Sequence, residues 1–185
     1  PHGPPGRGLL TGAAGFWCAQ RWRGRVGPLE GPSTGVVRGP APATGRARLM
    51  DALRAQGLWQ PRYHGRLRAV SGDLSQREFG LGTQGFVDLA REVDAVLHAG
   101  AWVHHAHGYE TLRAANVGGT LEVIRLACTG RWKPVGFVST LDVFPRGSPP
   151  GGDAWPEELL QDQPPPTHSG YAHLKWVAAR FPGPA

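Results

Sequence analysis

This chain of 185 residues has little lysine, asparagine, methionine or cysteine, and it contains no long apolar run. Without 18 consecutive apolar residues, a membrane-spanning helix is not expected. The first six residues, P-H-G-P-P-G, also lack the apolar core of a signal peptide. The two cysteines, Cys18 and Cys128, are expected to be buried thiols rather than a disulfide, which favours a cytoplasmic protein.

Positive charge exceeds negative charge by a formal +6, and arginine carries nearly all of it because Lys133 and Lys175 are the only lysines. The basic residues do not alternate with aromatic ones and form no recognition motif, so nucleic acid is not an expected partner. A phosphorylated cofactor or an acidic protein partner explains the charge equally well. The histidines at 104, 105 and 107 have no carboxylate or thiol beside them at ligand spacing, so we expect no metal site.

Glycine and proline together make up 46 of the 185 residues, and they gather in a few stretches. We predict a single domain over 1–185, with a disordered N-terminus at 1–7 and irregular segments at 19–34 and 145–168. Between these stretches, strand patterns alternate with helix patterns. Strands are predicted before Gly12 and at 35–38, 67–70, 93–98 and 135–139, and helices at 46–56, 83–92, 109–129 and 169–181. The alternation predicts an α/β fold with a doubly wound parallel sheet.

Residues with useful chemistry follow the ends of the predicted strands. The glycine turn Gly12–Gly15 follows the first strand, and Arg38, Asp73, His98–Ala101 and Ser139–Thr140 follow later ones. Ligands of a doubly wound sheet bind beyond the carboxyl ends of its strands, so these segments should converge at one edge. Glycines in such a turn let the backbone approach a pyrophosphate at a helix N-terminus. The spacing here is G-x-x-G-x-x-C, in which Cys18 stands where a third glycine is usual.

Tyr171 and Lys175 are four residues apart and therefore share one face of the last predicted helix. A lysine in that position favours the phenolate and lowers the pKa of the phenol. The hydroxyl of Thr140 can hydrogen-bond the same substrate oxygen that the phenol protonates. These three residues form an acid–base arrangement suited to hydride transfer to or from a carbonyl.

With these motifs the chain resembles the extended short-chain dehydrogenase/reductase family. More closely, it resembles the thioester reductase domains at the ends of nonribosomal peptide synthetases, polyketide synthases and carboxylic acid reductases. The match is dense from about 44 to 180. The matching segments are L-T-G-A-A-G-F at 10–16, G-R-A-R-L at 45–49, G-D-L at 72–74, V-D-A-V-L-H-A-G-A-W-V at 93–103, Y-E-T-L-R-A-A-N-V-G-G-T at 109–120, V-S-T-L-D-V-F at 138–144 and G-Y-A-H-L-K-W-V-A at 170–178.

The resemblance implies a Rossmann-like domain that uses NADPH to reduce an acyl group held as a phosphopantetheine thioester on an acyl or peptidyl carrier protein. The product would be an aldehyde or an alcohol. Tyr171 would protonate the developing alkoxide, Thr140 would donate a second hydrogen bond to it, and Lys175 would hold the nicotinamide ribose. Arg38 would pair with the 2′-phosphate, and Asn116 would brace the active-site helix. The implied cofactor-binding residues are Thr11, Gly12, Ala14, Gly15, Phe16, Arg38, Asp73, Leu74, His98, Ala99, Gly100, Ala101, Asn116, Ser139, Tyr171 and Lys175.

Two other functions remain open. A nucleotide-sugar epimerase or dehydratase shares the glycine turn, the threonine and Y-x-x-x-K, although the segments around Trp102 and 112–117 favour the thioester reductase. The second is that of a non-catalytic module, which binds NADP or docks a carrier protein. The family continues after the last helix with more sheet and a substrate domain. We therefore expect an incomplete fold that lacks the region holding the acyl arm.

Overall fold

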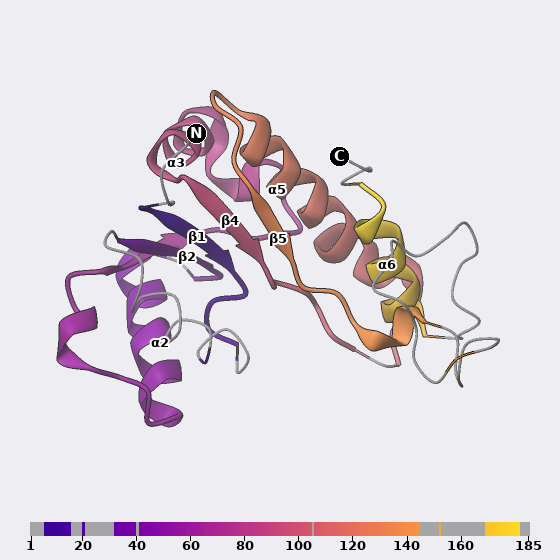
Figure 1. Ribbon diagram of the computed structural model, residues 1–185, viewed down its shortest axis with the longest axis horizontal. Coiled ribbons are helices and arrows are strands. Elements are labelled where there is room, and N and C mark those ends of the chain that lie inside the picture. Colours follow the sequence, from indigo (N-terminus) through magenta and orange to yellow (C-terminus); the bar gives the residue numbers. More distant parts are fainter. Residues whose placement is uncertain are drawn as a thin grey trace.

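The computed structural model describes residues 6–15, 20, 32–39, 41–104, 106–144, 152 and 169–181. Its sheet has five parallel strands in the order β3-β2-β1-β4-β5 (Figure 1). The strands are β1 (Gly8–Thr11), β2 (Ser33–Val37), β3 (Leu67–Ser71), β4 (Ala95–His98) and β5 (Val135–Phe137). The order runs outward in both directions from β1, so a ligand site is expected where β1 and β4 end.

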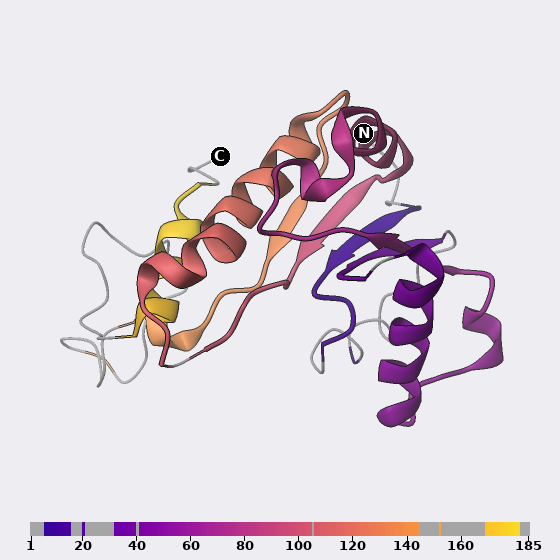
Figure 2. The same cartoon turned by 180° about the vertical axis from the view of Figure 1, so that it is seen from behind.

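Helices cover both faces of the sheet, which confirms the predicted doubly wound fold. They are α2 (Pro42–Ala55), α3 (Gly82–Glu92), α4 (Tyr109–Arg113), the π-helical η3 (Ala114–Gly118), α5 (Gly119–Cys128) and α6 (Gly170–Ala179). Short 3₁₀ turns stand at η1 (Pro61–Tyr63), η2 (Arg77–Gly80) and η4 (Leu141–Val143). Helix α2 lies on one face, and α3 and α5 lie on the other (Figures 1 and 2). Among the described helices, none has the length and apolar character needed to cross a membrane.

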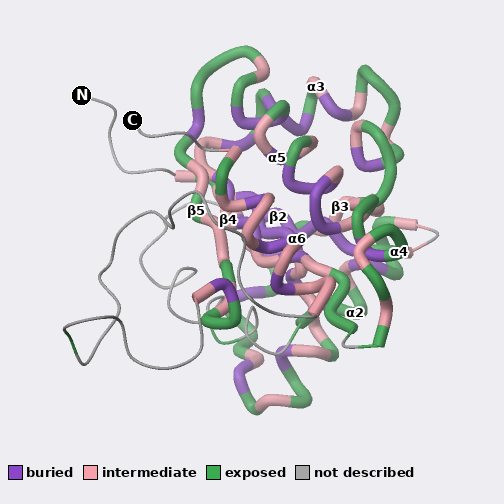
Figure 3. Tube along the Cα trace, turned by 90° about the vertical axis from the view of Figure 1, so that its right-hand side faces the viewer, coloured by how far each residue is buried: buried purple, intermediate pink, exposed green. Residues whose placement is uncertain are grey.

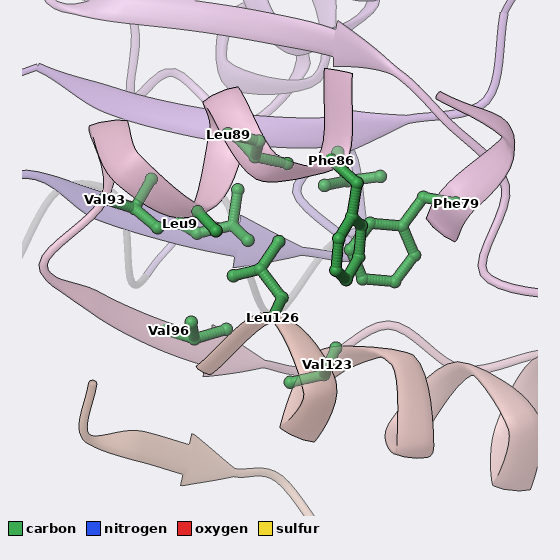
Figure 4. Close-up of a cluster of buried hydrophobic side chains, with 10 residues drawn as sticks. Leu9, Phe79, Phe86, Leu89, Val93, Val96, Val123 and Leu126 are labelled. Atoms are coloured by element: carbon green, nitrogen blue, oxygen red, sulfur yellow. The ribbon is translucent and has the colours of Figure 1, made fainter. Parts of the chain in front are cut away.

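Neighbouring residues of the central strands point to opposite faces, as the period of two in a strand requires. Leu10 and Val37 pack with Leu49 and Leu53 of α2, whereas Leu9 belongs to the opposite cluster. That second cluster joins the sheet to α3 and α5 through Leu9, Val36, Phe79, Phe86, Leu89, Val93, Val96, Val123 and Leu126 (Figure 4). Buried residues accordingly concentrate in the strands and along the inner sides of the helices (Figure 3).

The helix predicted at 109–129 is interrupted by a π turn at 114–118. A Cβ at Gly119 would lie 2.9 Å from both the Cβ and the carbonyl oxygen of Leu74, so only glycine lets the helix pass this close to the loop after β3. The wider π turn directly precedes this contact. Helix α6 then packs on α4 and η3 through Leu174, Leu112 and Val117.

Some boundaries differ from the sequence-based prediction. Strand β2 begins at Ser33 rather than at 35, because Ser33 and Thr34 are buried and pair with β1 and β3 despite their polarity. Arg7, expected in a disordered end, donates its backbone N–H to Asp94 Oδ2 at 2.9 Å. Residues 1–5, 16–19, 21–31, 145–151 and 153–168 lie outside the described part of the chain.

The expected burial of the cysteines is wrong for Cys128, which is exposed. It is the last residue of α5 and directly follows the buried residues Leu126 and Ala127. Lys133, by contrast, is only 4% exposed. Its ammonium donates to the carbonyl oxygens of Leu126, Thr129 and Arg131 at 3.2, 2.8 and 2.9 Å, and so caps the C-terminus of α5. Cys18 lies outside the described residues.

Candidate functional site

A cleft of about 550 Å³ lies at the carboxyl edge of the sheet, a volume typical of ligand sites. Its wall comes from the segments that follow all five strands and from the helical elements α4, η3 and α6. The lining comprises Gly12–Gly15, Val36, Arg38, Gly72–Ser75, Ala99–Val103, Thr111, Ala114, Ala115, Val138 and Tyr171. Of the residues predicted to converge, Gly12–Gly15, Arg38, Asp73 and Ala99–Ala101 line this cleft, whereas His98, Ser139 and Thr140 are not part of its lining.

Two glycines make the closest backbone approach in this wall. Gly12 has a φ of 70°, and a Cβ there would lie 2.7 Å from Gly100 Cα. A Cβ at Gly100 would lie 2.5 Å from Leu74 Cδ1 and 2.9 Å from Thr11 Oγ1. The turn closes with a hydrogen bond from Gly15 N to Gly12 O of 2.9 Å. Any side chain at Gly12 or Gly100 would force these segments apart.

A buried chain of hydrogen bonds holds this approach in place. Gly100 N donates to Thr11 Oγ1 at 2.9 Å, and Thr11 Oγ1 lies 2.6 Å from His98 Nδ1. On the other side of the ring, His98 Nε2 lies 3.0 Å from Thr120 Oγ1, which donates to Asn116 O at 2.7 Å. The Thr120 hydroxyl donates its hydrogen to Asn116 O, so it can only accept from His98. We therefore assign the imidazole proton to Nε2, which donates to Thr120, and infer that Nδ1 accepts from the Thr11 hydroxyl.

Burial keeps this imidazole neutral. His98 is 1% exposed, and burial followed by the charge of Lys175 lowers the pKa of His98 to about 3. The neutral ring both accepts and donates a hydrogen bond, which a doubly protonated ring could not do. His98 and Thr11 were predicted to bind cofactor, but their side chains lie behind the cleft wall and support it.

Asn116 has a different place from the one that the resemblance implies. Its side chain is buried, accepts from Trp102 N at 2.7 Å and donates to Trp102 O at 3.0 Å. Both of these hydrogen bonds hold the loop after β4 rather than α6. Ser139 is exposed and lies outside the cleft lining. Phe16 falls outside the described residues.

At the β2 and β3 end of the cleft, Arg38 and Asp73 both line the wall. Asp73 accepts from Ser75 N at 2.8 Å and from Ser75 Oγ at 2.7 Å. Burial alone would raise the pKa of Asp73, but these hydrogen bonds and the charge of Arg38 outweigh it and lower the pKa. Arg48 of α2 donates to the carbonyl oxygen of Arg38, which brings a second arginine to this end of the cleft. Sequence reasoning missed Arg48, although it lies in the matching segment at 45–49.

At the other end, Ser169 begins α6 by accepting from Ala172 N, and the helix then presents Tyr171 and Lys175. The ammonium of Lys175 donates to Val138 O at 2.7 Å and lies 4.7 Å from the centre of the Phe137 ring. Lys175 is 3% exposed, and burial lowers its pKa to about 8.

The expected effect of Lys175 on Tyr171 is not found in this structure. The pKa of Tyr171 is raised, first by burial and then by the negative charge of Asp142. The lysine charge is directed at the Val138 carbonyl and the Phe137 ring, and it is not among the causes of the Tyr171 shift. Sequence reasoning missed Asp142, because its effect depends on how η4 packs against α6.

The hydroxyl of Thr140 is engaged within its own turn. It accepts from Asp142 N at 3.3 Å and donates to Asp142 Oδ2 at 3.4 Å. Thr140 is therefore at the rim of the site, outside the cleft lining, with its hydrogen turned to a carboxylate. Both bonds are long, so a better acceptor in the cleft could compete for this hydrogen.

Comparison with known proteins agrees with this geometry. A model of the male sterility protein family of NAD-binding domains matches residues 34–181. The glycine betaine reductase ATRR of Emericella nidulans is 38% identical over 181 residues, covering 94% of this chain and 14% of that protein. The isonitrile lipopeptide synthase of Streptomyces coeruleorubidus is 36% identical over 182 residues, covering 97% of this chain and 12% of that protein.

Among solved structures, the terminal R domain from the myxalamid PKS-NRPS biosynthetic pathway is similar, with a TM-score of 0.86 and 35% identity. The similarity covers 96% of this chain and 45% of that one. The UDP-glucuronic acid 4-epimerase from Bacillus cereus has a TM-score of 0.63 at 21% identity, a likeness of fold alone. The chain thus spans less than half of these solved structures and a smaller share of the two curated relatives.

The buried histidine predicts a specific acid sensitivity. Unfolded His98 binds a proton below about pH 6.5, whereas the folded protein resists it down to about pH 3. As the pH is lowered from about 6.5 to about 3, the free energy of unfolding should therefore decrease, by on the order of 5 kcal/mol for this residue. The free energy of unfolding, measured with denaturant at several pH values in that range, should depend less steeply on pH for His98→Gln than for the unmodified chain. His64→Gln, at an exposed position, is the control and should keep the original slope. Equal slopes for all three chains would contradict a neutral buried His98.

Proposed function

Because this chain belongs to the male sterility protein family of NAD-binding domains, we propose that it forms the cofactor-binding and proton-donating part of an NADPH-dependent reductase for acyl thioesters. The observation that carries this proposal is one cleft lined by Arg38 at one end, with Arg48 bound to the carbonyl of Arg38, and by Tyr171 at the other end. Glycine turns and backbone segments line the space between these two ends.

The cleft fits a nicotinamide dinucleotide on structural grounds. The absence of side chains at Gly12 and Gly100 leaves room for a pyrophosphate beside the backbone that follows β1 and β4. Asp73, Leu74 and Ser75 form the wall beyond β3, where an adenosine would lie. Burial of Lys175 beneath Val138 provides a cation at the opposite end, close to Tyr171 in the helix.

The preference for NADPH rests on Arg38 and Arg48. A guanidinium matches a phosphate through paired, charge-assisted hydrogen bonds, and a neighbouring second guanidinium increases this attraction. Arg38 lines the cleft at the end of β2, where its guanidinium can reach a phosphate. Its carbonyl already accepts from Arg48, which keeps the two residues together.

The reaction needs one hydride and one proton at the substrate carbonyl. The hydride for the carbonyl carbon of the thioester would come from NADPH held in this cleft. Tyr171 gives its phenolic proton to the carbonyl oxygen, and Thr140 donates a hydrogen bond to the same oxygen. The resulting hemithioacetal loses the pantetheine thiol and leaves an aldehyde, while Tyr171 regains a proton from solvent. A second hydride and proton would convert the aldehyde to an alcohol.

The substrate is proposed to arrive on an acyl or peptidyl carrier protein. Trp102 and Val103 line the cleft yet remain 41% and 55% exposed, which suits contact with an apolar acyl chain. The similar R domain belongs to a PKS-NRPS pathway, which supports a tethered substrate. No observation on this chain favours a nucleotide-sugar epimerase over the reductase, since that likeness concerns the fold alone.

Removal of one arginine should separate the two nicotinamide cofactors. Arg38→Ala deletes charge-assisted hydrogen bonds to the 2′-phosphate, so the Kd for NADPH should rise on the order of 10-fold or more. The Kd for NADH should change little, because NADH lacks that phosphate. Titration calorimetry on this chain measures both constants. Arg54→Ala, which removes a surface partner of Asp51 on the same helix as Arg48, is the control and should leave both unchanged. Equal affinity of the unmodified chain for both cofactors would exclude the proposed role of Arg38.

Loss of the phenol should abolish most hydride transfer. The assay follows NADPH absorbance with an acyl-pantetheine thioester, using this chain and the same chain joined to the remaining part of the similar R domain. Tyr171→Phe should slow the reaction on the order of 100-fold or more, because no proton reaches the developing alkoxide. Tyr109→Phe is matched, since Tyr109 packs against the same cluster from α4, and it should react near the original rate. If NADPH binds and neither form turns over thioester, the chain is a non-catalytic module instead.

A further inference from the structure

Asp142 is an acidic residue beside Thr140, and the reaction above gives it no role. It lies in η4, two residues after Thr140, and it is exposed. Its backbone N–H donates to Thr140 Oγ1 at 3.3 Å, and its carboxylate Oδ2 accepts from the same hydroxyl at 3.4 Å. The turn thereby fixes the carboxylate beside a residue of the proposed acid–base set.

Among the described residues, the elements that pack most extensively on α6 are α4, η3 and η4, and η3 has no ionisable side chain. The backbone of His107 and Gly108 also lies against Gly170, at the start of α6. The ionisable groups of α4 are Tyr109, Glu110 and Arg113, and α6 itself carries His173 and Lys175. Within the described part of the chain, the pKa of Tyr171 is raised first by burial and then by the negative charge of Asp142 in η4.

We propose that Asp142 is a positioning residue of this site, whose carboxylate holds the Thr140 hydroxyl and puts a negative charge near the Tyr171 phenol, so that the site favours reduction over oxidation. This inference rests on the proposed function. Reduction starts from the phenol, which gives its proton to the substrate oxygen. Oxidation of an alcohol starts from the phenolate, which accepts a proton. A nearby carboxylate opposes the phenolate and favours the form that reduction needs.

The Asp142 carboxylate also accepts the hydrogen of Thr140, which is the second hydrogen-bond donor in the proposed reaction. While Thr140 donates to Asp142, its hydrogen is not available in the cleft. A developing alkoxide carries more charge than a resting carbonyl and competes better for this hydrogen. Thr140 therefore changes its acceptor when the charge appears, so its hydrogen bond stabilises the transition state more than the bound substrate.

The test is the titration of Tyr171 in Asp142→Asn, which removes the charge and keeps the shape of the side chain. Ultraviolet absorbance of the phenolate against pH, minus that of the matching Tyr171→Phe chain, isolates this residue from Tyr63 and Tyr109. The midpoint should fall by roughly half a pH unit at low salt, because the charge of an exposed carboxylate is screened by solvent. The fall should shrink in high salt. In an active reductase, the alkaline limit of the reduction rate should move in the same direction.

Three further variants decide between charge and shape. Asp142→Ala also removes the charge and should lower the midpoint, whereas Asp142→Glu keeps it and should stay near the original value. Asp51→Asn removes another exposed carboxylate, on α2, and should change nothing. An unchanged or higher midpoint in both Asp142→Asn and Asp142→Ala overturns the proposal. The titration needs neither cofactor nor substrate, so a failure of the proposed reductase activity would be seen separately.

Discussion

The buried chain of hydrogen bonds from Gly100 to Asn116 is the constraint on which the cleft depends. It joins the ends of β1 and β4 to the π turn before α5 through one neutral imidazole. Each hydroxyl in it both donates and accepts, so no member can be removed without leaving a buried polar atom unpaired. The side chain of Asn116 extends the same constraint to Trp102 in the cleft wall. The close approach of Gly12 and Gly100 is thus held from behind by polar contacts that do not touch the ligand space.

Both lysines of the chain are buried, and the arginines supply the solvated positive charge. Lys133 and Lys175 are 4% and 3% exposed, and each donates to backbone carbonyl oxygens. A compact ammonium can enter such a site, whereas Arg38 lines the cleft and carries a wide planar group that suits a phosphate. Arg48 donates to the carbonyl oxygen of Arg38.

Much of the fold follows from the sequence, because alternating strands and helices with glycines at the strand ends restrict the topology to a doubly wound sheet. The start of β2 does not follow, since Ser33 and Thr34 are polar and gain their place only from pairing with both neighbours. Positions after strands account for Gly12–Gly15, Arg38, Asp73 and Ala99–Ala101 in the cleft lining, but not for Thr111, Ala114 and Ala115, which come from helical elements. The direction of the Tyr171 pKa was not, because it depends on where the Lys175 ammonium and the Asp142 carboxylate lie in three dimensions. Helical spacing alone fixes neither position.

The central claim is that this one cleft binds NADPH along its whole length. Backbone amide chemical shifts of the chain during an NADPH titration test it most directly. The largest changes should gather at Gly12–Gly15, Arg38, Asp73–Ser75 and Ala99–Val103, with smaller ones near Val138. Changes that gather instead at the opposite edge of the sheet, around Thr34, Arg68 and Glu92, or no changes at all, would contradict the claim.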